Sequence, residues 1–254
     1  MTTPPSAPWL YPRWIAHRGA GKLAPENTLA AFRRGAQHGY RGFECDVKLS
    51  ADGVPFLLHD ATLERTTSGR GPASALTWNA LAALDAGAWH SAAFAGEAPP
   101  SLAAIAAFCL AGGHALNIEI KPTPGDEART GAVVAAQAAQ HWAGQAVPPL
   151  LSSFQPAALH TARDAAPALP RALLLDALLD GWFDAARALG CAAVVTQHAL
   201  MSAALIARLH DAGLRALVYT VNEPDVARRL LALGIDGLIT DAVDRFDPAA
   251  SGVT

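Results

Sequence analysis

The chain has 254 residues, of which 52% are hydrophobic and 16% charged, with 21 glycines and 18 prolines. This composition is too apolar for a disordered protein and too often interrupted by glycine and proline for a coiled coil. The formal net charge is -3 and no basic run is present, which argues against a nucleic-acid partner. The length fits one large domain, since α/β barrels of about 250 residues are common.

The cysteines and the apolar segments bear on the cellular location of the protein. Cys45, Cys109 and Cys191 lie far apart without a CxxC spacing, so neither a disulfide framework nor a zinc cluster is indicated. The first residues do not resemble a signal peptide, and no apolar stretch reaches the 18 or so residues of a membrane span. We therefore expect a cytoplasmic protein without stable membrane insertion, and its oligomeric state stays open.

Short apolar runs alternate with longer helical stretches from Trp14 onward, a pattern typical of parallel β/α folds. The predicted strands cover 14–16, 43–47, 116–120, 150–152, 172–175, 193–196, 216–220 and 237–240. The predicted helices cover 28–38, 102–111, 127–142, 157–165, 182–189, 203–212 and 225–233. Eight strands predict a single TIM (β/α)8 barrel domain over 1–254. A doubly wound open sheet is the alternative, although the glycine-rich turn after the first strand lacks a full GxGxxG motif.

A further apolar run, 54–58, follows the hairpin signal Asp52-Gly53, which reverses the chain, so we place it outside the barrel. The stretch 61–100 is too long for an ordinary connection between a strand and a helix. Together they predict a cap-like insertion over 54–100. Its aromatic residues Trp78, Trp89 and Phe94 either line a pocket or fill a small core, and we favour the core for about two of them.

Carboxylates fall repeatedly where the predicted strands end, which is where barrel enzymes keep their catalytic groups. Glu44 and Asp46 share one face of the second strand because their spacing is i, i+2, so Cys45 must point the other way. Glu119 has the matching place on the next barrel strand. Three carboxylates at one mouth repel one another unless a cation bridges them, so they are a candidate metal site. The alternative is ordinary solvent-facing charge, which the apolar surroundings of Glu119 disfavour.

Two histidines bracket this cluster. His17 ends the first strand and His59 ends the returning hairpin arm, so the pair could divide the work of general base and general acid, with His59 favoured as the acid. Arg18 and Lys121 supply positive charge suited to a phosphate, the alternative being ion pairs with the same carboxylates. We expect packed or exposed positions for the remaining histidines, namely His38, His90, His114, His141, His160, His198 and His210.

An ordered set of short motifs resembles the glycerophosphodiester phosphodiesterase family over nearly the whole chain. The matching stretches are His17-Arg18-Gly19, Pro25-Glu26-Asn27-Thr28, Glu44-Cys45-Asp46-Val47, Asp52-Gly53, His59-Asp60, Thr62-Leu63, Arg65-Thr66-Thr67, Gly69, Asp85-Ala86-Gly87, Asn117-Ile118-Glu119-Ile120-Lys121, Ser152-Ser153-Phe154, Thr220-Val221-Asn222 and Thr240-Asp241. No single tripeptide is specific, but their order is.

The resemblance implies a TIM barrel that hydrolyses small glycerophosphodiesters, such as glycerophosphocholine or glycerophosphoethanolamine, to glycerol 3-phosphate and an alcohol. It implies one Mg2+ or Ca2+ ion on Glu44, Asp46 and Glu119, the catalytic pair His17 and His59, and substrate binding by Arg18, Lys121, Tyr219 and Asn222. One departure is Tyr219, where many members carry tryptophan.

Three other functions compete with this interpretation. One is another metal-dependent phosphodiesterase on the same barrel, of the phospholipase C or D type. The second is a noncatalytic glycerophosphodiester-binding protein, which the presence of both histidines disfavours. The third is a metal-dependent sugar isomerase, which has less need for the pair Arg18 and Lys121. The preferred alcohol, the choice of metal, and water or a glycerol hydroxyl as nucleophile stay open.

Overall fold

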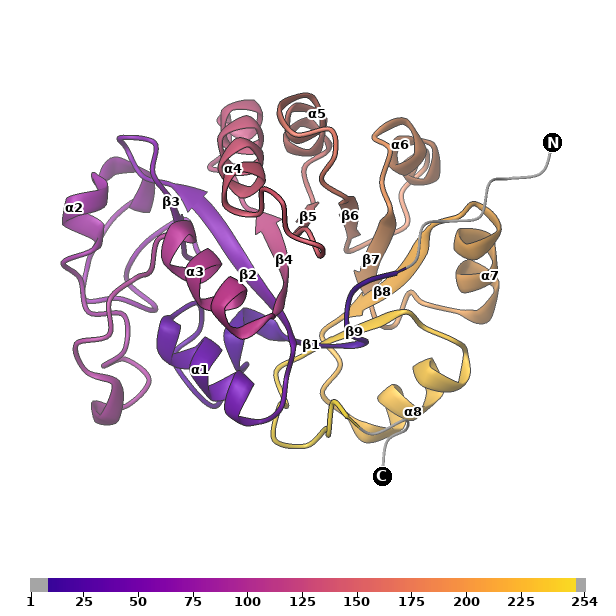
Figure 1. Ribbon diagram of the computed structural model, residues 1–254, viewed down its shortest axis with the longest axis horizontal. Coiled ribbons are helices and arrows are strands. Elements are labelled where there is room, and N and C mark those ends of the chain that lie inside the picture. Colours follow the sequence, from indigo (N-terminus) through magenta and orange to yellow (C-terminus); the bar gives the residue numbers. More distant parts are fainter. Residues whose placement is uncertain (1–8, 250–254) are drawn as a thin grey trace.

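The computed structural model describes residues 9–249, and in this part of the chain eight parallel strands form a closed barrel with helices around it (Figure 1). The sheet order is β1-β9-β8-β7-β6-β5-β4-β2-β3, and pairing of β1 with β2 closes the barrel. The barrel strands are β1 (Trp14–Ala16), β2 (Gly42–Leu49), β4 (Ala115–Ile120), β5 (Leu150–Ser153), β6 (Arg171–Leu175), β7 (Ala193–Gln197), β8 (Arg215–Tyr219) and β9 (Gly237–Thr240). The predicted TIM barrel is confirmed, and the open sheet is excluded.

The helices begin where the sequence supplies a cap or a proline. The side chains of Thr28, Ser101 and Ser202 each accept a hydrogen bond from the backbone N–H three residues further along the chain. Each bond satisfies a donor that the helix itself leaves unpaired. Proline opens α5 and α8, where a missing N–H costs nothing. The outer helices are α1 (Leu29–Gln37), α3 (Leu102–Gly112), α4 (Glu127–His141), α5 (Pro156–Ala165), α6 (Trp182–Ala188), α7 (Ala203–Asp211) and α8 (Pro224–Ala232).

Side chains alternate between the helix-facing layer and the barrel interior along each strand. Phe43, Cys45 and Val47 of β2 belong to the large core beneath the helices, as the i, i+2 spacing predicted for Cys45. The interior is filled by a second cluster whose buried members all come from strands, namely Ile15, Leu150, Ala172, Leu174, Ala193, Val195, Leu217 and Ile239. The interior is therefore packed, and only its carboxyl end is left for polar chemistry.

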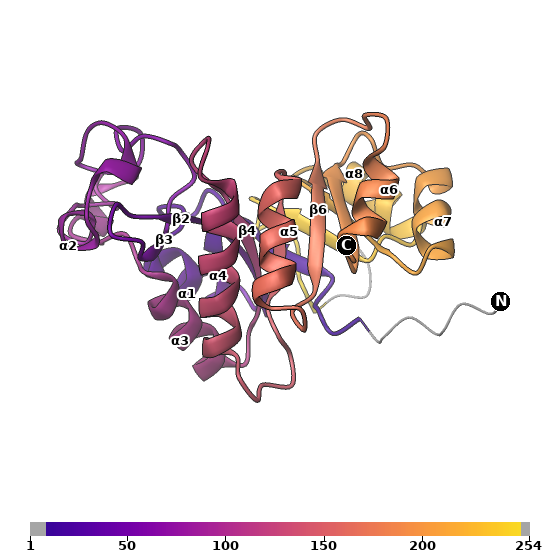
Figure 2. The same cartoon turned by 90° about the horizontal axis from the view of Figure 1, so that it is seen from above.

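The insertion between β2 and α3 projects to one side of the barrel (Figures 1 and 2). β3 (Pro55–Leu57) pairs antiparallel with β2 and stands outside the barrel, as predicted, and α2 (Trp78–Leu81) follows it. Trp78 packs against a small core of this segment, and Phe94 packs against the main core. Trp89 is 41% exposed. Two of the three aromatics are therefore packing residues, as expected.

Beyond β9 the described residues contain only turns and irregular structure, so the barrel lacks a helix after its last strand within 9–249. No helix in that range is long and apolar enough to cross a membrane.

Candidate active site

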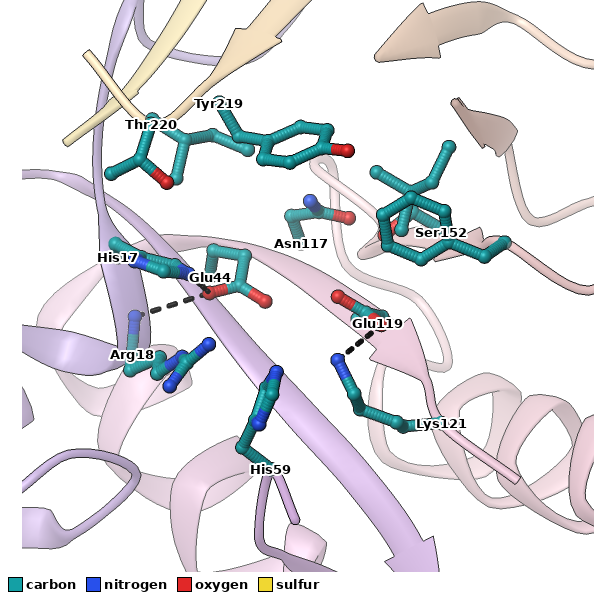
Figure 3. Close-up of a pocket in the computed structure, with 13 residues that line it drawn as sticks. His17, Arg18, Glu44, His59, Asn117, Glu119, Lys121, Ser152, Tyr219 and Thr220 are labelled. Carbon is teal, nitrogen blue, oxygen red and sulfur yellow. Dashed lines mark hydrogen bonds and ion pairs between the residues drawn. The ribbon is translucent and has the colours of Figure 1, made fainter. Parts of the chain in front are cut away.

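A cavity of about 210 Å³ opens at the carboxyl ends of the barrel strands (Figure 3). It gathers the two histidines, both cations and two of the three carboxylates that the sequence singled out. The complete lining is His17, Arg18, Glu44, His59, Asn117, Glu119, Lys121, Ser152, Phe154, Leu174, Tyr219, Thr220 and Ile239. Asp46 does not line this cavity, but its carboxylate contacts two residues that do, Arg18 and Lys121.

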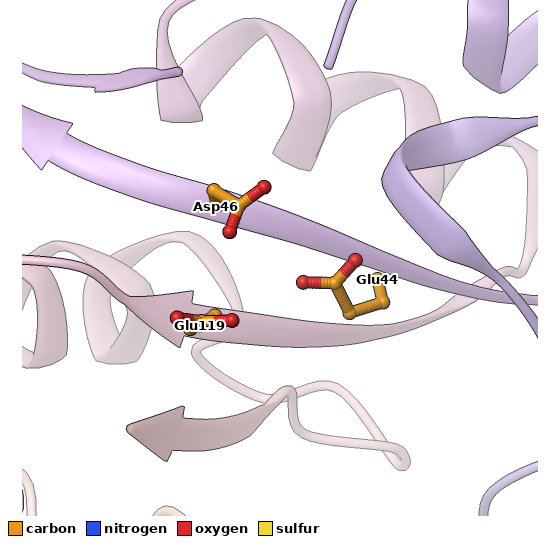
Figure 4. A group of neighbouring side chains, drawn as sticks. All are labelled: Glu44, Asp46 and Glu119. Atoms are coloured by element: carbon orange, nitrogen blue, oxygen red, sulfur yellow. The ribbon is translucent and has the colours of Figure 1, made fainter. Parts of the chain in front are cut away.

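Glu44, Asp46 and Glu119 form the predicted carboxylate cluster (Figure 4). The parallel register pairs Asp46 with Glu119, and one carboxylate oxygen of each of the three residues lies within 4.8 Å of the others. Burial and the neighbouring charge of Asp46 raise the pKa of Glu44 to about 8 and the pKa of Glu119 to about 7. A divalent cation with oxygen ligands would relieve that repulsion, so the donor set fits a hard metal ion.

Asp46 is the carboxylate that stays ionised. Its burial opposes ionisation, but Lys121, Arg18 and His59 outweigh that effect and hold its pKa below the usual range. Lys121 Nζ lies 3.1 Å from Asp46 and 2.9 Å from Glu119, and Arg18 Nε lies 3.3 Å from Asp46. The sequence left ion pairs with the carboxylates as the alternative to phosphate binding by Arg18 and Lys121, and these ion pairs are present. Both cations also line the cavity, so phosphate binding by them stays a prediction.

The turn after β1 brings the Arg18 backbone to this cluster. Arg18 adopts a left-handed conformation with φ of 50°, and its N–H donates to Glu44 Oε2 at 3.1 Å. Asn27, also left-handed at φ of 58°, donates its amide to Asp46 at 2.8 Å and accepts the Asp46 N–H. Such conformations are uncommon outside glycine, and here they aim two donors at two buried carboxylates.

His17 is held by a carboxylate from the opposite end of the sequence. His17 Nδ1 lies 2.6 Å from Asp241 Oδ1, and Asn222 binds Asp241 through its amide and accepts the Asp241 N–H. An ionised carboxylate only accepts hydrogen bonds, so the shared proton belongs to Nδ1. His17 Nε2 then faces the cluster, 3.8 Å from Glu44.

His59 has a similar partner in a different setting. Its Nδ1 lies 2.7 Å from Asp60, whose carboxylate also accepts two hydrogen bonds from Arg65. Arg65 in turn binds Glu26 through both of its terminal nitrogens, and Glu26 accepts a third bond from Arg18. A network of charged side chains therefore holds His59, which comes from the insertion, at the cavity.

The surroundings give the two imidazoles opposite pKa shifts. Burial disfavours charge on His17, but Asp241 and Glu44 outweigh it and raise the pKa of His17. Burial and Arg18 lower the pKa of His59, although Asp46 and Asp60 act in the other direction. At a given pH His17 is therefore protonated to a greater extent than His59. Which of the two acts as the acid stays a prediction, and the sequence favoured His59.

Of two further residues predicted to bind substrate, Tyr219 lines the cavity and Asn222 does not. Tyr219 lines the cavity, and its hydroxyl donates to the Leu175 carbonyl at 3.2 Å. Asn222 is not among the lining residues and instead holds Asp241, so direct contact with substrate stays a prediction for it.

Sequence reasoning gave no role to four residues of this site: Asn27, Asp241, Asn117 and Ser152. Asn117 had a usable signal, since it precedes Glu119 by two residues and so shares its strand face. Asp241 also had a signal, since it directly follows the last strand at the carboxyl end of the barrel, but its contact with His17 spans 224 positions and could not be foreseen.

Comparison with known proteins places this site in context. The glycerophosphoryl diester phosphodiesterase family model matches residues 17–245. A glycerophosphodiester phosphodiesterase of Caldanaerobacter subterraneus is 32% identical over 232 residues, covering 89% of this chain and 93% of the relative.

Solved structures agree with this match. A phosphodiesterase of Oleispira antarctica, solved with the product sn-glycerol-3-phosphate, superposes with a TM-score of 0.87 at 34% identity over 91% of this chain and 94% of that one. A glycerophosphodiester phosphodiesterase of Agrobacterium tumefaciens gives a TM-score of 0.77 at 29% identity over 92% and 97%. The chain belongs to the glycerophosphoryl diester phosphodiesterase family, a family of phosphoric diester hydrolases.

Proposed function

We propose that the protein hydrolyses glycerophosphodiesters, such as glycerophosphocholine or glycerophosphoethanolamine, to glycerol 3-phosphate and an alcohol in a metal-dependent reaction. The observation that carries this proposal is one cavity lined by two histidines, two cations and two members of the carboxylate cluster. The product bound to the Oleispira antarctica phosphodiesterase supports glycerol 3-phosphate as the phosphate-bearing product. The cytoplasmic location expected from the sequence stays a prediction.

Glu44, Asp46 and Glu119 are the residues that would hold one divalent ion, Mg2+ or Ca2+. A bound ion of this kind supplies Lewis-acid polarisation of a phosphate oxygen. The three carboxylates come from two adjacent strands, so their spacing is fixed by the sheet rather than by a mobile loop.

In this proposal the two histidines move the protons of the reaction. His59, the imidazole with the lowered pKa, removes the proton from the attacking oxygen, of water or of a glycerol hydroxyl. His17, whose proton is favoured by Asp241 and Glu44, donates to the departing alkoxide. Asp241 and Asp60 each occupy an Nδ1 atom, which leaves both Nε2 atoms for the substrate. Arg18 and Lys121 are the cations that would bind the phosphate, and Tyr219 contributes an aromatic wall.

The proposal is tested by assaying purified protein on glycerophosphocholine and glycerophosphoethanolamine with excess EDTA, Mg2+ or Ca2+. We expect release of glycerol 3-phosphate with one of the cations and none with EDTA. Glu119→Gln should remove most of the activity while the fold persists, because the residue stands at the barrel mouth. Binding of glycerophosphocholine without turnover under every condition would instead identify a noncatalytic binding protein, and full turnover by metal-free protein would contradict metal dependence.

A further inference from the structure

Two uncharged polar side chains of the cavity have no role in the proton transfers or the carboxylate cluster. Asn117 on β4 is 3% exposed and Ser152 on β5 is fully buried. Neither the two polar atoms of the Asn117 amide nor the Ser152 hydroxyl has a hydrogen-bond partner among the described residues. A buried polar group without a partner is destabilising, so such groups are rare unless they serve a ligand or water.

The sheet register places both side chains beside the carboxylates. Asn117 is paired with Glu44 across β2 and β4, and Ser152 is paired with Glu119 across β4 and β5. Both line the cavity that holds the two histidines (Figure 3). The two unpartnered groups therefore lie next to the carboxylate cluster, Asn117 beside Glu44 and Ser152 beside Glu119 on the neighbouring strands.

The cavity also has apolar walls. Phe154, Leu174 and Ile239 line it together with Tyr219, whose ring meets the Phe154 ring edge to face at 5.8 Å. Leu174 and Ile239 belong to the packed barrel interior. A ligand fragment that fits here must be small, must present carbon to these walls, and must present neutral hydrogen-bonding groups to Asn117 and Ser152.

A carboxamide and a hydroxyl can each donate and accept, and neither carries charge. They therefore match neutral hydroxyl groups, which also donate and accept. A phosphate is better served by Arg18 and Lys121, and a quaternary ammonium by an aromatic face or a carboxylate. Two adjacent hydroxyls on a three-carbon chain fit the combination of polar and apolar walls.

We propose that Asn117 and Ser152 bind the free hydroxyl groups of the glycerol moiety and so select glycerol-bearing phosphodiesters. This inference rests on the proposed function. It makes the two side chains specificity residues rather than proton-transfer residues.

The test compares two ligands that differ only in their hydroxyls, sn-glycerol 3-phosphate and n-propyl phosphate, by calorimetric titration at one fixed Mg2+ concentration. We expect the wild-type protein to bind sn-glycerol 3-phosphate about tenfold or more tightly, because propyl phosphate leaves both polar groups unpaired. Asn117→Leu and Ser152→Ala should each reduce this ratio by roughly threefold to tenfold, chiefly by weakening the glycerol ligand.

Thr196→Val is the matched control. The Thr196 hydroxyl is equally buried and equally without a partner among the described residues, but Thr196 is not among the residues lining the cavity. Its removal should leave the ratio unchanged. If Asn117→Leu fails to fold, Ser152→Ala carries the test, since it removes a single oxygen.

The outcomes separate this inference from the proposed function. Equal affinity of the wild-type protein for both ligands would overturn the glycerol subsite, even if the protein hydrolyses glycerophosphocholine. Equal weakening of both ligands in the two variants would also overturn it, because the side chains would then only hold the pocket or its water in shape. Absence of hydrolysis with a preserved ligand ratio would defeat the catalytic proposal and leave the subsite standing.

Discussion

At the scale of single residues, the two histidines of the site, His17 and His59, have different charged neighbours. His17 has Asp241 at 2.6 Å and Glu44 at 3.8 Å, so two acids favour its charged form. Asp60, the partner of His59, shares its negative charge with Arg65, which binds both of its oxygens. These neighbours help to shift the two imidazole pKa values in opposite directions, which is the basis of the proposed division of roles.

This difference predicts how the histidine variants respond to the leaving group. His17→Ala should lose at least about 10²-fold in kcat/KM on glycerophosphocholine, because an alkoxide leaves poorly without a proton. A glycerophosphodiester with a p-nitrophenol leaving group should restore much of that loss, since nitrophenolate departs unprotonated. His59→Ala should lose a similar factor on both substrates. Rescue of His59→Ala alone would reverse the assignment, and near wild-type rates of both variants on glycerophosphocholine would refute the pair.

We expect Asp241 to act through His17, with which it shares a hydrogen bond, and its removal should show this in the pH profile. Asp241→Asn removes the acid that raises the pKa of His17, so the pKa of the imidazole falls. A general acid must be protonated, and activity declines as pH rises through its pKa. The alkaline limb of kcat/KM should therefore move to lower pH in the variant. Asp184→Asn, at an exposed position of α6, is the control with an unshifted limb. An unmoved limb in Asp241→Asn would contradict the positioning role.

At the scale of elements, local signals and tertiary pairing explain different features. The caps of α1, α3 and α7 are local interactions, and the reversal at Asp52-Gly53 is a local signal that the sequence predicted. β2 extends to Leu49, beyond the predicted end at 47, because β3 returns to pair with Val47, Lys48 and Leu49. The pairing of His17 with Asp241 and of Asp46 with Asn27 depends on barrel closure and a left-handed turn, which no local pattern reveals.

The insertion offers a prediction about its aromatic residues. Trp78 packs in the core of the insertion, whereas Trp89 is 41% exposed, and neither lines the cavity. Trp78→Ala should lower the melting temperature clearly, as loss of a packed tryptophan costs up to about 3–5 kcal/mol and Trp78 is only partly buried. Trp89→Ala should cost about 1 kcal/mol, mainly its hydrogen bond to the Ala86 carbonyl. Both variants should process choline and ethanolamine substrates in the wild-type ratio, and a changed ratio would show that the insertion selects the alcohol.

At the scale of the whole molecule, the barrel concentrates negative charge that its fold cannot itself neutralise. Eight strands and the carboxylate positions were predictable because strand alternation and the carboxyl-end rule act everywhere in a parallel barrel. How those charges balance was not predictable. Lys121 pairs with Glu119 and Asp46, and Arg18 pairs with Glu26 and Asp46, while burial and the charge of Asp46 raise the pKa of Glu44. The folded protein therefore carries an electrostatic cost at its mouth, and a bound cation should reduce that cost.

Cation binding should then appear as stability of the entire barrel. A ligand that binds only the folded state adds about 2.7 kcal/mol when present at a hundred times its dissociation constant. Mg2+ or Ca2+ should accordingly raise the melting temperature of EDTA-treated protein. The gain should be larger at pH 8 than at pH 6, because protons on Glu44 and Glu119, whose pKa values are raised, compete with the cation at the lower pH. Glu119→Gln should lose most of the gain without losing metal-free stability, since the substitution removes one of three mutually repelling acids and Lys121 retains Asp46. Calorimetric melting at both pH values measures this, and an equal gain in wild type and variant would show that the cation binds elsewhere.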